Sequence, residues 1–298
     1  MKPNRTYMTQ TALPEISIKE NSGDRLPNIF SPEFRQETTA LTKRLFIQLI
    51  RRPTTLIAGI LQPLMWLILF GALFRYAPEG FLGDGQTYIQ FLAAGIIVFS
   101  AFSGALNSGL PVLFDREFGF LNRMLVAPLV SRFSIVLASA IYIITTTVIQ
   151  TLVIIGASAV MGAGLPNLAG FGVVVLVLML LVLGFTMISL GLAFAMPGHQ
   201  ELLAFIFLVN LPLMFSSTAL APVAFMPTWL KWVACLNPLS FAIEPIRYVY
   251  SHSDWSWSSV VLTAPWGDMT LFSFVIELLF FVGLVAIAIR GVLRRGVA

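Results

Sequence analysis

Most charged side chains in the central half of this chain lie in one short segment, residues 113–132. Between Phe81 and Lys231 the only other charges are Asp84 and Glu201, and the segment itself carries Asp115, Arg116, Glu117, Arg123 and Arg132. Apolar runs flank the segment on both sides, so its ionic groups can meet a partner only outside a bilayer core. We predict that they form polar contacts with another protein. The alternative is a loop whose charges only set the orientation of the neighbouring spans.

The sequence contains no residue pattern typical of a catalytic or metal site. It has no His-Glu-x-x-His zinc pair and no Gly-x-x-x-x-Gly-Lys-Ser/Thr phosphate loop, and His199 and His252 lie at predicted loop edges. Cys235 is the single cysteine, which excludes an intrachain disulfide. We therefore expect no enzymatic activity and no metal or cofactor bound by this chain.

Glu277 is the one acidic or basic side chain that falls well inside a predicted span. A charge at the centre of a bilayer costs roughly 2.5–3.5 kcal/mol on insertion scales, so this carboxyl should be paired, protonated or turned towards protein. Arg247 or Lys231 is the expected partner in a structural ion pair. The alternative is a role in binding substrate or protons, which would suit a transporter driven by an ion gradient.

Hydrophobic residues make up 57% of the 298 residues and charged residues only 11%, with a mean hydropathy of +0.87. This composition is typical of a membrane protein with several spans. The apolar sequence divides into runs of about the length that a helix needs to cross roughly 30 Å of hydrocarbon. We predict an all-α membrane protein with six transmembrane helices at approximately 54–74, 88–110, 133–161, 169–195, 202–220 and 271–289.

Basic residues are distributed unevenly around these spans. Nine of the eighteen precede Pro53, three lie in the segment 113–132, and three follow the sixth span. Only Arg75, Lys231 and Arg247 fall on the other side. Because cytoplasmic flanks retain Lys and Arg, we predict that both termini and the segment 113–132 are cytoplasmic. The expected location is the inner (cytoplasmic) membrane.

The connection between the fifth and sixth spans is largely apolar but is interrupted by prolines and charges. Four prolines disfavour a continuous helix, and Lys231, Glu244 and Arg247 leave too few uncharged residues between them for a span. We predict two short helices within 221–250 that enter the outer leaflet and return, shielded by protein. Tryptophans in and after this segment are expected at the lipid headgroup level: Trp229, Trp232, Trp255, Trp257 and Trp266.

Residues 1–30 lack an apolar core, and we predict a flexible cytoplasmic tail rather than a signal peptide. One membrane domain should then extend over residues 31–298. Ser31, Pro32 and Glu33 supply a helix cap, a first-turn proline and a first-turn acid. The helix that follows has apolar residues on one face and basic residues on the other. We therefore predict an amphipathic helix in the cytoplasmic headgroup region.

Small residues follow one another at helical spacing in the second span. Ser100, Gly104 and Ser108 form one row, and Ala101, Ala105 and Gly109 form the next. Such rows let helix backbones approach closely in lipid. We expect this span to pack tightly against another helix, either in the same chain or in a second copy.

Two segments of the sequence resemble those of type-2 ABC transporter permeases. The first is Glu117-Phe-Gly-Phe-Leu-Asn-Arg-Met-Leu-Val-Ala-Pro-Leu-Val-Ser-Arg132, which is similar to the cytoplasmic loop of that family. The second is Asn237-Pro-Leu-Ser-Phe-Ala-Ile-Glu-Pro-Ile-Arg247, which resembles a segment of its long outer connection. The resemblance covers the chain from about Ser31 onward. It is strongest to daunorubicin-resistance permeases of bacteria and to cyanobacterial or plastid relatives.

This resemblance implies an exporter built from two permease chains and two ATP-binding subunits, with ATP and magnesium held by the ATPase. The segment from Leu113 to Val126 would form a coupling helix seated on that ATPase, beside the amphipathic helix. The implied docking residues are Asp115, Arg116, Glu117, Phe118, Phe120, Leu121 and Arg123. The translocation path would be lined by the second and fifth spans, with Asn107, Asn210, Ser216 and Ser217 as candidates.

The sequence leaves two questions open. An apolar path with a few hydroxyls and amides suits an amphipathic drug, a lipid or a glycolipid equally, because one fold hosts many cargoes. A chain of six spans without an internal repeat needs a partner to close a pathway, and a homodimer is the simplest arrangement. A secondary transporter that uses Glu277 is the rival class.

Overall fold

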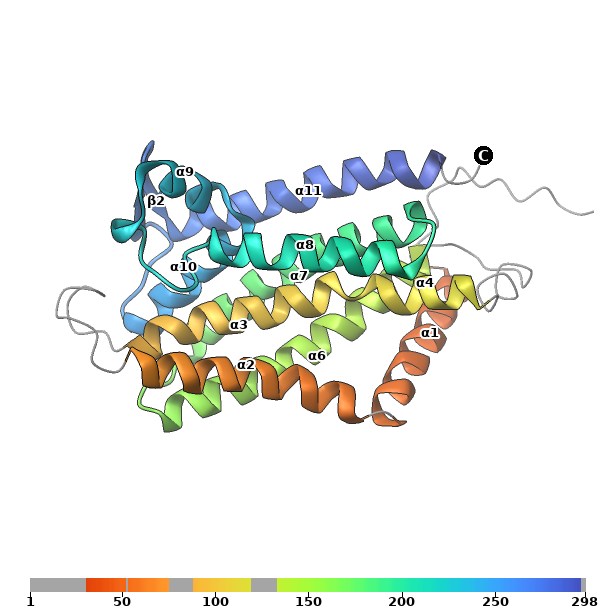
Figure 1. Ribbon diagram of the computed structural model, residues 1–298, viewed down its shortest axis with the longest axis horizontal. Helices are drawn as coiled ribbons and strands as arrows, with labels where there is room; N and C mark the ends of the chain where they lie inside the picture. Colours follow the sequence, from red (N-terminus) through yellow and green to blue (C-terminus); the bar gives the residue numbers. More distant parts are fainter. Residues whose placement is uncertain (1–30, 52, 75–87, 119–132, 296–298) are drawn as a thin grey trace, which may run out of the picture.

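The computed structural model describes residues 31–51, 53–74, 88–118 and 133–295. Most of its helices lie side by side along one axis, while α1 crosses them at one end (Figure 1). The predicted all-helical class is therefore confirmed for most of the described chain. The exception is a two-stranded antiparallel hairpin, β1 (Val260–Ala264) and β2 (Gly267–Thr270), which the sequence analysis did not predict.

A helix lies at each of the six predicted spans. Four are long and apolar enough to cross a membrane, namely α3 (Tyr88–Leu106) continued by α4 (Gly109–Glu117), α6 (Phe133–Val160), α7 (Leu168–Ala195) and α11 (Leu271–Arg295). Two are shorter apolar helices, α2 (Pro53–Leu73) and α8 (His199–Phe215). The fifth predicted span thus ends at Phe215 rather than at residue 220, because the chain turns there.

Helices α3 and α7 form the interior of the bundle. Helix α7 is apolar on all sides and packs against α3, α6, α10 (Pro238–Ser251) and α11, as expected of a central helix. The outward faces of α2, α8 and α11 are also apolar, with exposed side chains such as Leu69, Phe207 and Phe280. Apolar faces of this extent are typical of a protein surrounded by lipid.

The amphipathic helix begins where the sequence predicts. Helix α1 (Pro32–Arg51) starts after Ser31, whose hydroxyl accepts a hydrogen bond from the Phe34 backbone N–H at 3.2 Å. Phe34 is buried, and Phe46 meets the Tyr142 ring of α6 edge-on at 5.4 Å between ring centroids. The apolar face of α1 therefore packs partly on protein. Its place in the headgroup region stays a prediction.

The segment after α8 contains the two expected short helices, α9 (Thr228–Leu236) and α10, preceded by the 3₁₀ turn η1 (Val223–Phe225). Asn237 separates them, and its side-chain oxygen accepts from the Leu239 backbone N–H at 2.9 Å. Its amide donates to the Leu213 carbonyl at 2.8 Å, which fixes α10 to the end of α8. Two short helices are thus confirmed, and their entry into a leaflet stays a prediction.

The second predicted span is broken rather than straight. Helix α3 ends at Leu106, Asn107 and Ser108 form a turn, and α4 begins at Gly109. Ser189 of α7 bridges this break: its hydroxyl donates to the Leu106 carbonyl at 2.5 Å and accepts from the Gly109 backbone N–H at 2.9 Å. Backbone groups released inside a membrane protein need such partners. The interruption is therefore held by the neighbouring helix.

Gly109 is required for this contact. A Cβ atom at this position would lie 2.4 Å from the Ser189 backbone oxygen, whereas a Cβ at Gly104, also in the small-residue rows, would meet nothing within 4 Å. The row that contains Gly109 thus packs against α7 of the same chain. Beside Gly104 itself there is open space in the described chain.

We expect Gly109→Ala to destabilise the protein and Gly104→Ala to leave its stability unchanged. Overpacking of this kind typically costs about 1–3 kcal/mol, because a backbone oxygen cannot move aside as a flexible side chain can. The midpoints of thermal unfolding in detergent, compared with wild type, check this expectation. Equal midpoints for the two variants would contradict the close approach of α4 and α7.

Candidate functional site

Four helices meet at one end of the bundle, where α1, α4, α7 and the start of α8 lie together (Figure 1). Charged side chains are concentrated at this meeting point. We refer to Arg44, Asp115, Arg116, Glu117 and His199 as the α4 cluster. Each of its members makes a polar contact with an element other than its own.

Asp115 joins α4 to α1. Its two carboxylate oxygens accept hydrogen bonds from one Arg44 guanidinium nitrogen at 2.8 and 3.0 Å. Both side chains are about 30% exposed, so solvent screens their attraction in part. The pair therefore contributes mainly by fixing where α1 lies relative to α4.

Arg116 binds the carboxyl end of α7. Its guanidinium donates hydrogen bonds to the backbone carbonyls of Ala193 at 3.0 Å and Phe194 at 3.3 Å, and to those of Met196 and Pro197 beyond the helix end. The last carbonyls of a helix lack intrahelical partners and carry partial negative charge. A planar cation with several N–H groups satisfies them together. Arg116 thus caps α7 from a neighbouring helix.

Glu117 binds the opposite kind of helix end, the amino terminus of α8. Its carboxylate accepts from the His199 backbone N–H at 2.6 Å and contacts the His199 ring nitrogen Nδ1, also at 2.6 Å. The backbone hydrogen bond, and then the ring, lower the pKa of the Glu117 carboxyl below its ordinary value. An anion at a helix amino terminus is favourable. The ionised form of Glu117 therefore links α4 to α8.

The predicted docking residues divide into three groups. Asp115, Arg116 and Glu117 are engaged within the chain, which the sequence analysis did not foresee. Phe118 follows them and is 80% exposed. Phe120, Leu121, Arg123 and most of the segment Leu113–Val126 lie outside the described residues. Docking to an ATPase stays a prediction for all of them.

Sequence comparison places the chain among known membrane proteins. Residues 36–251 match the ABC-2 type transporter family. The chain belongs to this family. It is 50% identical over 96% of its length to ycf38 of Porphyra purpurea and 53% identical over 83% to ycf38 of Cyanophora paradoxa, both named as transport permeases. These alignments cover 99% and 85% of the relatives.

A more distant relative carries a more specific name. DrrC of Mycobacterium tuberculosis (strain ATCC 25618 / H37Rv), named as a doxorubicin resistance ABC transporter permease, is 27% identical over 72% of this chain and 76% of its own length. The resemblance found in the sequence is thus confirmed. The protein is a transport permease of the ABC-2 type.

In this ABC-2 chain, the residues predicted to line a path form two separate groups. The Asn107 amide donates to the Ser103 carbonyl at 2.7 Å, and the Asn210 amide reaches the Ser103 hydroxyl at 3.5 Å, leaving the Asn210 side-chain oxygen buried without a partner. Ser216 and Ser217 instead bind backbone carbonyls of α8. Asn107 and Asn210 are therefore close to one another, and a path lined by these residues stays a prediction.

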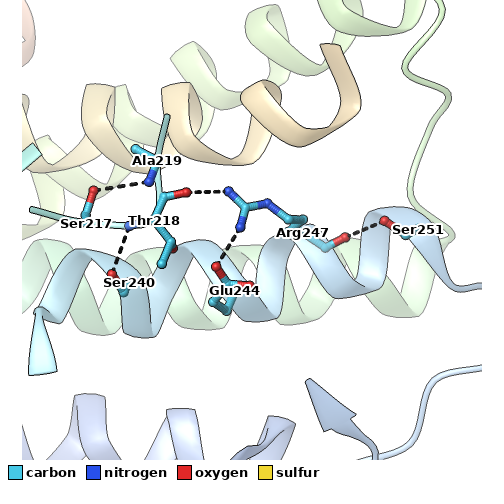
Figure 2. Close-up of polar contacts among 7 residues, drawn as sticks. All are labelled: Ser217, Thr218, Ala219, Ser240, Glu244, Arg247 and Ser251. Atoms are coloured by element: carbon cyan, nitrogen blue, oxygen red, sulfur yellow. Dashed lines mark hydrogen bonds and ion pairs between the residues drawn. The ribbon is translucent and has the colours of Figure 1, made fainter. Parts of the chain in front are cut away.

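The expected pairing of Glu277 with Arg247 is wrong. Arg247 binds Glu244 on its own helix, with 2.6 Å between Nη1 and Oε1, and both side chains are 9% exposed (Figure 2). Their spacing of three residues places them on one face of α10. Neither Arg247 nor Lys231 pairs with Glu277 in the described chain, and Oε2 of Glu277 is buried without a hydrogen-bond partner.

Arg247 also binds the turn after α8. Its Nη2 donates to the Thr218 carbonyl at 2.7 Å (Figure 2). Its guanidinium carbon lies 3.6 Å from the centre of the Phe91 ring. Ser240 supports the same turn by accepting from the Thr218 backbone N–H at 3.1 Å. Helix α10 thus fixes this turn against α3. Within the described residues no group of three His, Cys, Asp or Glu could hold a metal ion.

We expect Arg116→Ala to destabilise the isolated permease by about 1–2 kcal/mol, because partly buried carbonyls at the end of α7 lose their charged donor. The matched control is Arg35→Ala, since Arg35 is an exposed arginine on α1. Chemical unfolding of the purified chain, without any other subunit, measures the difference. No difference between the two variants would assign Arg116 to partner contacts alone.

We expect Glu277→Gln and Glu244→Gln to have opposite consequences. Removing the Glu277 charge relieves a poorly partnered carboxyl, so stability should be unchanged or slightly higher. Removing the Glu244 charge leaves the buried Arg247 guanidinium unpaired, which costs roughly 3–5 kcal/mol. The unfolding midpoints of the two variants in the same detergent test this contrast. A clear loss of stability in Glu277→Gln would indicate an ion pair that the described contacts lack.

Proposed function

We propose that this chain is the membrane subunit of an ATP-driven exporter in the inner (cytoplasmic) membrane. Its ATP-binding subunit would be a separate protein that holds ATP and magnesium. Membership of the ABC-2 family and the name of the relative DrrC support this proposal. Residues 1–298 contain no phosphate-loop motif, in keeping with a motor on a separate chain.

The observation that carries the proposal is the α4 cluster. Its contacts tie α1, α7 and α8 to α4, so a displacement of α4 is passed to three other helices at once. In the sequence, residues 118–132 link α4 to α6. A partner bound to these residues would therefore also act on α6, a fifth helix. An ATPase that binds this connection could therefore move much of the bundle. The exposed Phe118 would be its first apolar contact.

In this proposal α2 and α8 also span the membrane, which gives six spans with both termini in the cytoplasm. The helices α9 and α10 would occupy the outer leaflet. Two identical chains would enclose the translocation path, with Asn107, Asn210, Ser216 and Ser217 near it. The substrate would be amphipathic or lipid-like, because the apolar helix faces offer few polar groups.

We expect Phe118→Asp to abolish co-purification of the ATP-binding subunit without lowering the stability of the permease. An exposed aromatic side chain contributes to an interface but not to the core of its own chain. The matched control is Phe225→Asp, since Phe225 is 56% exposed in η1, outside the α4 cluster. Affinity purification from native membranes, followed by mass spectrometry, identifies the bound proteins.

Three results would oppose the proposal. One is the absence of any ATP-binding protein from the wild-type sample under gentle solubilisation. A second is its equal loss from both variants. The third is transport by reconstituted vesicles that ignores ATP but follows a proton gradient and is lost in Glu277→Gln. That last result would favour an ion-driven carrier, for which the unpartnered oxygen of Glu277 is the supporting observation.

A further inference from the structure

A cavity of about 590 Å³ is lined in part by residues of α9 and α10. These two helices lie at the end of the bundle opposite α1 and α4 (Figure 1). Its walls come from the start of α3, from η1, α9 and α10, and from β1 with the turn that follows. Cavities of this size hold small organic ligands or parts of larger ones. It is separate from the α4 cluster and from the side chains predicted to line a translocation path.

The lining of the cavity carries one net positive charge. Lys231, Glu244 and Arg247 are its charged members. Glu244 neutralises Arg247 through the ion pair at 2.6 Å. The Lys231 side chain has no hydrogen-bond or ion-pair partner among the described residues, although the residue is partly buried. A cation beside a buried ion pair favours an anionic ligand.

Arg247 provides a second, independent indication. The residue is 7% exposed, and its two terminal nitrogens bind Glu244 and the Thr218 carbonyl. Its remaining donor nitrogen, Nε, is buried and has no partner among the described residues. Buried donors are rarely left unsatisfied in proteins. A ligand oxygen that satisfied this donor from the cavity would also lie near Lys231, since both residues line the cavity.

The remaining walls are apolar and aromatic. Phe91 lies beneath the Arg247 guanidinium, and Val223, Trp232 and Leu262 contribute further apolar surface. Trp232 is half exposed and packs against the Trp266 ring, with 5.5 Å between ring centroids. Exposed tryptophans of this kind are typical of the headgroup level of a bilayer. A bare inorganic ion could not use these walls, but an amphiphile could.

We infer that this cavity binds the singly charged anionic headgroup of an amphiphile, with Lys231 and the free Nε–H of Arg247 contacting the negative group. The apolar part of the ligand lies along Val223 and Trp232. The lining disfavours cationic amphiphiles, because they would add to the positive charge of Lys231. This inference concerns a ligand bound at the outer helices and does not require ATP-driven transport.

Titration calorimetry of the full-length chain in detergent tests the inference with three probes. These are dioctanoyl phosphatidylglycerol, which is anionic, dioctanoyl phosphatidylcholine, which is zwitterionic, and inorganic phosphate. We expect the anionic lipid to bind more tightly than the other two. The comparison on the wild-type chain decides the headgroup preference without any substitution.

Substitutions at Lys231 then locate the site. Lys231→Gln should weaken binding of the anionic lipid about tenfold, as loss of one charge-assisted contact predicts. Lys231→Arg should retain most of the affinity, and Lys43→Gln, which removes an exposed lysine of α1 at the other end, should change nothing. Arg247 is left intact because it also holds the turn after α8.

Several outcomes would overturn the inference. Equal affinity for the anionic and zwitterionic lipids would remove the role of charge. Phosphate that binds as tightly as the lipid would indicate a site for a free anion. Unchanged binding in Lys231→Gln, or equal weakening in Lys43→Gln, would place the anionic lipid elsewhere. Thermal unfolding midpoints of all variants separate lost binding from lost folding.

Discussion

Unpaired backbone groups are the constraint on which this structure depends. A helix that ends or breaks leaves N–H and C=O groups without intrahelical partners, and each costs free energy wherever the fold keeps water from it. Here the partners are side chains from other elements. Ser189 serves the break between α3 and α4, Arg116 serves the end of α7, and Arg247 serves the turn after α8.

The scarcity of polar residues makes these contacts decisive. Packing between apolar helices in lipid is weakly directional, so it does not by itself fix how far one helix slides along another. A hydrogen bond to a particular carbonyl does fix it. The α4 cluster sets the positions of helices at one end. At the other end, the contact of Arg247 with Thr218 and the contact of Asn237 with Leu213 do the same. The long apolar segments between these two ends contribute packing but do not fix the positions of the helices.

Sequence patterns predicted where the helices lie but not the polar contacts that hold them to one another. Runs of apolar residues predict helix positions because length and hydropathy are local properties, and the cap at Ser31 is local as well. The contact of Ser189 with Leu106 joins residues 83 apart, and no local pattern indicates it. The Glu244–Arg247 pair was recognisable from its three-residue spacing once a helix was assumed. The β1–β2 hairpin was missed because its strands are short and bury only one residue each, Ala264 and Met269.

The pairing of charges within the α4 cluster limits how strongly salt can change electrostatic attraction at this end of the bundle. The Asp115 carboxylate is already paired with Arg44, and the Glu117 carboxylate already accepts from the His199 backbone N–H, so both are engaged before another molecule approaches. Ionic strength acts on charges that solvent can reach and that lack a close counter-ion. If the proposed ATP-binding subunit docks at this end, where Phe118 is exposed, its association would gain little long-range attraction from these carboxylates and would rely on close apolar contact.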